Sequence, residues 1–116
     1  MRIFPSAPSL GVDLLEFERV KSFYKAHQDS LDSVLDAAEV AYIRRGARPV
    51  ERLARLLAAK EAVYKTLGGA AGGVAGFLDV RVVSPGSRKI YFRGLKIQFH
   101  KNKKFLVADA HRQKKA

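Results

Sequence analysis

Three side chains of the types that handle metal-bound phosphate groups stand out in the sequence: Asp13, Glu61 and Lys65. Glu61 and Lys65 are four residues apart, a spacing that places both on one face of a helix, one turn from each other. A magnesium ion on a diphosphate needs only one or two protein carboxylates, because phosphate oxygens and water complete its coordination, and a nearby lysine can neutralise further charge. The three residues are the minimum set for such a site.

Each of these residues also has a plainer explanation. Pairs such as Glu61 and Lys65 are common on solvent-exposed helix faces, where each contributes about 0.2–0.5 kcal/mol. Asp13 precedes an expected helix, and its carboxylate can cap that helix. On spacing alone, an exposed ion pair is the more frequent case, so the hypothesis of a metal and phosphate site needs further support.

A long helix is expected to carry two of the three residues. Apolar side chains recur with helical spacing over residues 50–67, and the alanines among them are good helix formers. Gly68 and Gly69 are expected to end this helix, because glycine accepts the left-handed conformation without a Cβ penalty.

The N-terminal part of the chain is expected to hold a strand and two more helices. A short apolar run over 10–15, interrupted by Asp13, predicts a strand that turns into a helix ending near His27. A second helix is expected over 31–43, after a cap region at residues 29–30.

The C-terminal part changes to a period of two after a glycine-rich loop that extends to Gly76. The alternation predicts strands over 78–82, 90–92, 95–99 and 105–110, with a polar hairpin loop over 100–104. Helices followed by an antiparallel meander, which the strand over 10–15 can join, indicate an α+β fold with helices packed on an antiparallel sheet. We expect one domain over residues 1–116.

The charge of the chain is strongly uneven. The net charge is +11, and the excess lies in residues 81–116, where 11 lysines and arginines accompany one acidic residue, Asp109. A basic surface favours an anionic partner, but charge alone does not separate nucleic acid, a phosphorylated metabolite and an acidic protein.

Other classes of protein are excluded by composition. With no cysteine there is no disulfide framework, thiol nucleophile or cysteine-ligated zinc site. Residues 1–5 lack the apolar run of a signal peptide, and nowhere do about 18 apolar residues follow one another. The three histidines, His27, His100 and His111, lack the spacing of a zinc site. We expect a cytoplasmic protein that does not enter a membrane.

Two segments resemble the signatures of a known family. Gly11-Val12-Asp13-Leu14 with Glu18-Arg19-Val20 resembles the G-x-D-[IL]…R-[IV] signature of holo-acyl-carrier-protein synthases, the small 4'-phosphopantetheinyl transferases. Residues 57–68, LAAKEAVYKTLG, resemble the family's F-A-A-K-E-A-x-x-K-A-[LF]-G, and residues 34–39, VLDAAE, are similar to its I-L-T-x-x-E segment. The order and separation of these segments match the family as well, so the resemblance covers most of the chain.

The resemblance implies a magnesium-dependent transfer of the phosphopantetheine arm of coenzyme A to a serine of an acyl carrier protein, which leaves adenosine 3',5'-bisphosphate. Carried over by position, Asp13 and Glu61 hold the magnesium, and Lys65 contacts the phosphates or the leaving group. Glu61 helps to deprotonate the serine, directly or through water on the metal. Gly68 lets the chain pass close to the nucleotide. The carrier serves fatty-acid synthesis or another pathway, such as polyketide synthesis.

The resemblance also implies partners for the basic surface. Arg19 falls at the family's docking arginine for the acidic carrier protein, which suits a protein of charge +11. The family forms homotrimers in which Asp13 and Glu61 of one chain work beside Arg19 of a neighbour.

The sequence departs from the family's pattern in three places. The glycine run over 68–73 replaces G-T-G-I, and Leu56 takes the position of an arginine, with Arg55 and Arg52 nearby as replacements. Residues 98–101, QFHK, align with the C-terminal S-[IL]-[ST]-H segment, so its histidine is either replaced by Lys101 or displaced by one to His100. These positions belong to the coenzyme A side of the site, so we expect magnesium and phosphate binding to be retained better than affinity for the adenosine end.

A second hypothesis is a catalytically weakened member of the family that acts as a basic binding module for nucleic acid or an acidic protein. Aromatic residues alternate with lysines and arginines over 88–105, a pattern that can stack on nucleic acid but is more often one buried face of a meander. No RNA- or DNA-binding signature accompanies it, so nucleic acid is not the expected partner. A pure binding module also has no chemical reason to keep Asp13, Glu61 and Lys65.

Overall fold

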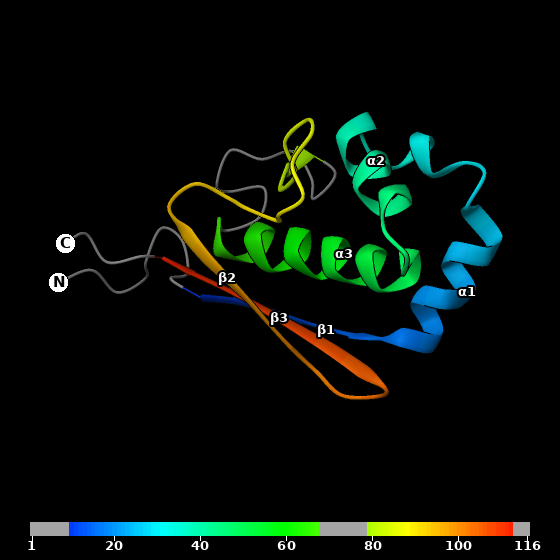
Figure 1. Ribbon diagram of the computed structural model, residues 1–116. Helices are drawn as coiled ribbons and strands as arrows, with labels where there is room; N and C mark the ends of the chain where they lie inside the picture. Colours follow the sequence, from blue (N-terminus) through cyan, green and yellow to red (C-terminus); the bar gives the residue numbers. More distant parts are fainter. Residues whose placement is uncertain (1–9, 68–78, 113–116) are drawn as a thin grey trace, which may run out of the picture.

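The chain folds as one strand, a series of helices and a C-terminal β-hairpin. The computed structural model describes residues 10–67 and 79–112. Its elements are β1 (Leu10–Glu16), α1 (Phe17–His27), the short 3-10 helix η1 (Leu31–Ser33), α2 (Ala37–Arg45), α3 (Pro49–Thr66), β2 (Leu95–Lys101) and β3 (Phe105–Arg112). Figure 1 shows α3 lying along one face of the sheet, with α2 and the segment before β2 on the opposite side of α3.

The three strands form one antiparallel sheet with β3 in the centre. The strand order is β1-β3-β2, and the register places Asp13 opposite Ala108 and Gln98 opposite Asp109. The N-terminal strand therefore joins the C-terminal hairpin, as predicted, and the expected α+β class with helices on an antiparallel sheet is confirmed.

Helix α3 is the centre of the hydrophobic core. Pro49 stands in its first turn, where a missing N–H costs no hydrogen bond. The side chains of Leu53, Leu56 and Val63 are fully buried. The predicted helix over 50–67 is thus confirmed, whereas its predicted end at Gly68 and Gly69 and the glycine-rich loop lie outside the described residues.

Strand β1 approaches α3 closely at Gly11. A Cβ atom at this position would overlap with the carbonyl oxygen of Ala62 and lie 2.6 Å from Oγ1 of Thr66. Only glycine allows this approach, because the obstacle at Ala62 is backbone. The contact sets the height of β1 along α3 and therefore the place of Asp13, two residues further along β1.

The helix predicted over 31–43 is interrupted, contrary to expectation. Residues 31–33 form η1, and α2 begins only at Ala37. Asp36 caps α2: its Oδ1 accepts a hydrogen bond from the amide of Glu39 at 2.8 Å, and Oε1 of Glu39 accepts one from the amide of Asp36 at 3.0 Å. This reciprocal capping box starts a new helix where apolar spacing alone indicated a continuous one.

The strands predicted over 78–82 and 90–92 are wrong where the structure describes them. Residues 79–94 contain no strand, although the amide of Tyr91 donates a hydrogen bond to the carbonyl of Val82 at 2.8 Å. Val80, Val82 and Val83 are buried in the core beside α3. The alternation over these residues reflects which side chains are buried in the core. The segment itself lies over α3 and not beside β2 (Figure 1).

Candidate active site

Asp13 and Lys65 come together between β1 and α3. The ammonium group of Lys65 donates a hydrogen bond to the carbonyl oxygen of Val12 at 2.9 Å, and its Nζ lies 3.5 Å from Oδ1 of Asp13. Residues 53 positions apart in the sequence are thus brought together by the passage of β1 along α3. The structure therefore joins two of the three side chains that the sequence singled out.

Asp13 is held in a largely dehydrated position. Its side chain is only 15% exposed, and its buried Oδ2 atom has no hydrogen-bond partner among the described residues. Burial raises the pKa of Asp13 above its usual value, and the nearby Lys65 opposes that rise by favouring the charged form. A buried carboxylate oxygen without a protein partner is a position that an ion or a water molecule can occupy.

The alternative explanation of Asp13 as a helix cap is ruled out. Asp13 lies inside β1, three residues before its end, and the cap position of α1 is Glu16, whose side chain makes no capping hydrogen bond. Its carboxylate faces α3, on the same side of the strand as the buried Gly11. Asp13 is therefore placed for an interaction between strand and helix.

Glu61 lies one turn before Lys65 on α3 and is half-buried. Among the described residues it makes no ion pair, and the ammonium of Lys65 contacts β1 instead. The simple pairing of Glu61 with Lys65 on an exposed helix face therefore does not hold, and the Glu61 carboxylate stays available.

The donor set fits a magnesium ion that takes part of its coordination from a substrate. Asp13 offers a carboxylate oxygen without a partner, and Glu61 offers a carboxylate without an ion pair. In the part of the chain that the structure describes, no group of three or more histidine, aspartate or glutamate side chains could enclose a metal. Magnesium is commonly bound by one or two carboxylates together with phosphate oxygens and water.

The other two predicted site residues stand apart from this pair. Arg19 is exposed on α1 and lines a hollow of about 260 Å³ with Leu14, Leu15, Glu16 and Phe105. Gly68, the predicted nucleotide contact, lies outside the described residues.

Lys60, the residue before Glu61 in α3, forms a buried ion pair with Glu39 that was not predicted from the sequence. Nζ of Lys60 lies 2.5 Å from Oε2 of Glu39, and the two side chains are 0% and 1% exposed. Because Oε1 of Glu39 also closes the capping box with Asp36, the pair ties the start of α2 to α3. The feature of the sequence that could have indicated this pair is Lys60 itself, a lysine within an apolar stretch next to Glu61.

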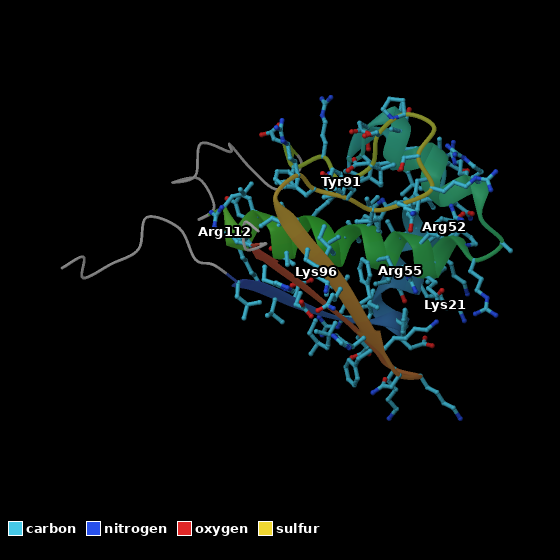
Figure 2. All side chains as sticks on the ribbon, turned by 60° about the vertical axis from the view of Figure 1, so that its left-hand side comes forward. Lys21, Arg52, Arg55, Tyr91, Lys96 and Arg112 are labelled. Carbon is cyan, nitrogen blue, oxygen red and sulfur yellow. The ribbon has the colours of Figure 1, made fainter. Side chains whose placement is uncertain are left out.

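The two arginines proposed as replacements at the family's arginine position have different surroundings (Figure 2). Arg52 lies toward α2: it donates a hydrogen bond to the carbonyl of Tyr42 at 2.7 Å and lies 4.8 Å from the centre of its ring. Arg55 lies 5.1 Å from the ring centre of Phe99 on β2, and its buried Nε has no hydrogen-bond partner among the described residues. Leu56 itself is fully buried. Of the two neighbouring arginines, Arg55 is the one whose buried Nε donor is unused among the described residues.

Lys101, one of the two candidates for the family's histidine position, has a partner on α3. Its Nζ lies 2.5 Å from Oε1 of Glu51. The hydrogen bond from Lys101 holds the pKa of Glu51 below its usual value. The departure at this position therefore forms a contact between β2 and the first turn of α3.

Comparisons with known proteins extend over nearly the whole chain. The family model of the 4'-phosphopantetheinyl transferase superfamily matches residues 9–115. A holo-[acyl-carrier-protein] synthase of Thermodesulfovibrio yellowstonii is 33% identical over 103 residues, which cover 88% of this chain and 86% of that protein. One from Staphylococcus saprophyticus is 33% identical over 93 residues, covering 76% of this chain and 80% of the relative.

The fold is similar to that of a solved relative. The crystal structure of holo-[acyl-carrier-protein] synthase from Neisseria meningitidis superposes with a TM-score of 0.63 at 18% identity, covering 91% of this chain and 98% of that one. No helix in the described parts is long and apolar enough to cross a membrane. From its sequence matches over residues 9–115, the chain belongs to the 4'-phosphopantetheinyl transferase superfamily, within the holo-[acyl-carrier-protein] synthase family.

Proposed function

We propose that this protein transfers the 4'-phosphopantetheine group of coenzyme A to a serine of an apo acyl carrier protein, with magnesium bound by Asp13 and Glu61. Membership of the family supports the reaction. The observation that carries the assignment to residues is the buried, unpartnered Oδ2 of Asp13 beside the ammonium group of Lys65. Bound magnesium would offset the negative charge of the diphosphate of coenzyme A.

Lys65 supplies positive charge to the phosphate groups. Its ammonium has three N–H donors, of which two are used, by the carbonyl of Val12 and by Oδ1 of Asp13, and the side chain is 49% exposed. The remaining donor can reach a phosphate oxygen. Since charge shifts onto the leaving phosphate during phosphoryl transfer, a lysine fixed at this place stabilises the transition state.

Glu61 accepts the proton of the carrier serine. The serine oxygen forms a bond to the pantetheine-side phosphorus, the bond from that phosphorus to the bridging oxygen breaks, and adenosine 3',5'-bisphosphate leaves. The proton of the hydroxyl passes to the Glu61 carboxylate, which has no ion-pair partner among the described residues.

Arg55 is the best-placed side chain for a phosphate at the adenosine end. Its guanidinium already lies against Phe99 and retains an unused buried donor, whereas Arg52 is engaged with Tyr42. Guanidinium groups bind phosphate in a planar, two-point manner. The contact of Gly68 with the nucleotide stays a prediction.

The proposed assembly is the homotrimer with shared active sites that the family resemblance implies, and one exposed face of the sheet supports a subunit interface. The face of β1 that points away from α3 exposes Leu10, Val12 and Leu14 by 53%, 45% and 57%. A row of apolar side chains on an open sheet face is a common sign of an interface. In a trimer, Arg19 of one chain would meet a carrier whose serine lies at Asp13 and Glu61 of a neighbour.

Other parts of the proposal rest on the family's chemistry. The carrier that docks at Arg19 is acidic, which suits the chain's charge of +11. A single domain, a cytoplasmic location and a role in fatty-acid synthesis remain predictions.

Incubation with coenzyme A, magnesium and several apo carrier proteins tests the proposal. Mass spectrometry of the carrier should show the gain of one phosphopantetheine group, and the gain should require magnesium. If no carrier gains mass while the protein binds nucleic acid, the proposal fails and the binding-module hypothesis takes its place.

A further inference from the structure

The turn between β2 and β3 carries two lysines that have no ion-pair partner among the described residues. Lys103 and Lys104 are exposed, and the turn is firmly held: the side chain of Asn102 accepts hydrogen bonds from the amides of Lys104 and Phe105, both at 2.8 Å. The amide of Phe17 donates a further hydrogen bond to the carbonyl of Lys104 at 2.8 Å. The backbone of the turn is thus bound to the start of α1, and both lysines project from this fixed turn.

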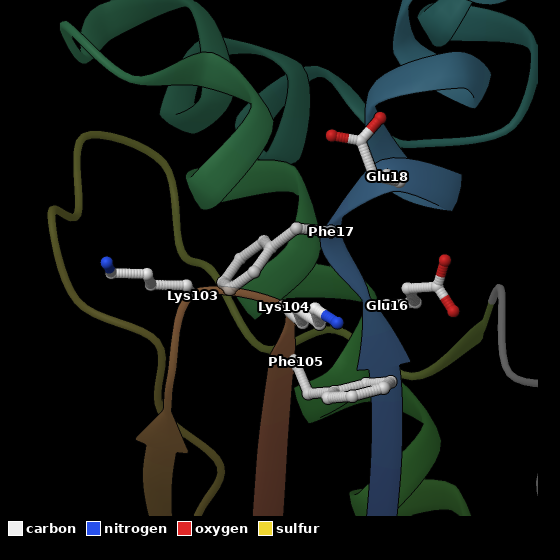
Figure 3. A pocket seen from close by; sticks show the side chains of 6 residues that line it. All are labelled: Glu16, Phe17, Glu18, Lys103, Lys104 and Phe105. Carbon is white, nitrogen blue, oxygen red and sulfur yellow. The ribbon is translucent and has the colours of Figure 1, made fainter.

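A hollow of about 430 Å³ lies between this turn and the start of α1. The rings of Phe17 and Phe105 line it together with Lys103, Lys104, Glu16 and Glu18. Figure 3 shows the lysines coming from the turn and the glutamates from the β1–α1 junction, with Lys104 lying between the rings of Phe17 and Phe105. The hollow is therefore lined by two aromatic rings together with two basic and two acidic side chains.

The hollow is a neighbour of the one lined by Arg19, because the two share lining residues. Glu16 and Phe105 line both. Phe105 therefore lies between Arg19, the proposed docking arginine, and the lysines of the turn. A partner that covers both hollows would contact Arg19 together with Lys103 and Lys104.

We propose that Lys103 and Lys104 form a second docking point for the acyl carrier protein, in which an apolar side chain of an acidic carrier surface enters the hollow over Phe17 and Phe105. The inference rests on the proposed function and adds to it a site on a different element from Arg19. Charge complementarity identifies the partner: the lysines attract carboxylates, while Glu16 and Glu18 repel them and so restrict how the carrier can lie.

The test is the charge reversal Lys103→Glu with Lys104→Glu, compared with Arg88→Glu and Lys89→Glu. The control pair is also adjacent, exposed and without an ion-pair partner in the described parts, and it changes the net charge equally. The KM for the carrier should rise about tenfold in the turn variant, with the KM for coenzyme A unchanged and the control within about twofold of wild type. The difference should shrink in 0.5 M salt, because exposed charges are screened.

A second variant tests the direction of the effect. Glu18→Gln removes a repelling carboxylate and should lower the KM for the carrier. The neutral variant Lys103→Gln with Lys104→Gln should raise it less than the reversal does, and circular dichroism checks that each variant is folded.

Equal KM values for the turn variant and the Arg88/Lys89 control would overturn the inference, as would a rise in the KM for coenzyme A alone. A wild-type protein that transfers nothing would instead contradict the proposed function, so the two failures are distinguishable.

Discussion

Lys60 and Glu39 form an ion pair that is buried inside the protein, 2.5 Å apart, and Lys60 directly precedes the proposed metal ligand Glu61 in α3. Lys65, four residues after Glu61, has the opposite setting: it is 49% exposed and reaches the carboxylate of Asp13. The two lysines of α3 thus have different roles: Lys60 holds α2 against α3, and Lys65 faces the site. We therefore expect substitution of Lys60 to affect stability and substitution of Lys65 to affect the transfer rate.

Lys60→Met should unfold the protein at lower urea concentration. The substitution leaves the carboxylate of Glu39 buried without its cation, which costs about 3–5 kcal/mol of unfolding free energy. Lys65→Met should change stability by less than about 1 kcal/mol and lower the transfer rate about 100-fold. Equal losses of stability in the two variants would contradict this division.

Arg55→Met should raise the KM for coenzyme A about tenfold, because a charged hydrogen bond to phosphate is worth about 1.5–3 kcal/mol. Arg52→Met should instead lower the melting temperature, because Arg52 bonds to the carbonyl of Tyr42. Steady-state kinetics with coenzyme A and thermal unfolding separate the two effects. An unchanged KM in Arg55→Met would exclude this arginine from the coenzyme site.

The Glu51–Lys101 pair should make stability depend on pH. The pKa of Glu51 is lower in the folded protein than in the unfolded chain, so the pair stabilises above the unfolded pKa and loses its effect as pH falls through the folded pKa. Because the pair is partly exposed, Glu51→Gln should cost at most about 1 kcal/mol at pH 7. Urea unfolding across pH should show this cost disappear in acid; a cost that persists there would have another origin.

Leu14→Glu should break the proposed trimer. It places a charge in the exposed apolar row on β1, and burying a charge between subunits is costly. Light scattering should show three chain masses for wild type and one for the variant, and transfer should be lost with the assembly. The control is Val34→Glu, which changes a 39% exposed apolar residue outside the sheet and should leave the trimer intact. A monomeric wild-type protein would refute the assembly.

Local patterns predicted the elements that hold the site but not all of their contacts. The helix over 50–67 and the strand around Asp13 follow from periodicity. The period-two run after residue 78 correctly predicted the strands over 95–99 and 105–110, which are β2 and β3. It was wrong over 79–82 and 90–92, because burial beside α3 also alternates without a neighbouring strand to pair with.

Contacts between side chains that are far apart in the sequence could not be predicted from local patterns. Nothing local to Lys60 indicates Glu39, 21 residues earlier, and choosing between Arg52 and Arg55 requires knowing that Tyr42 and Phe99 lie on opposite sides of α3's start. The carboxylate–lysine set itself was identified from residue type and family resemblance, and the structure adds the contact between Asp13 and Lys65.

The initial rate of phosphopantetheine transfer in Glu61→Gln is the most direct test of the assignment of chemistry to this site. The substitution keeps the size of the side chain but removes its charge and its ability to accept a proton, so the rate should fall by 100-fold or more at saturating magnesium. Asp32→Asn, the same change at an exposed carboxylate of η1, should leave the rate unchanged. A Glu61→Gln protein that modifies its carrier as fast as wild type would contradict the account.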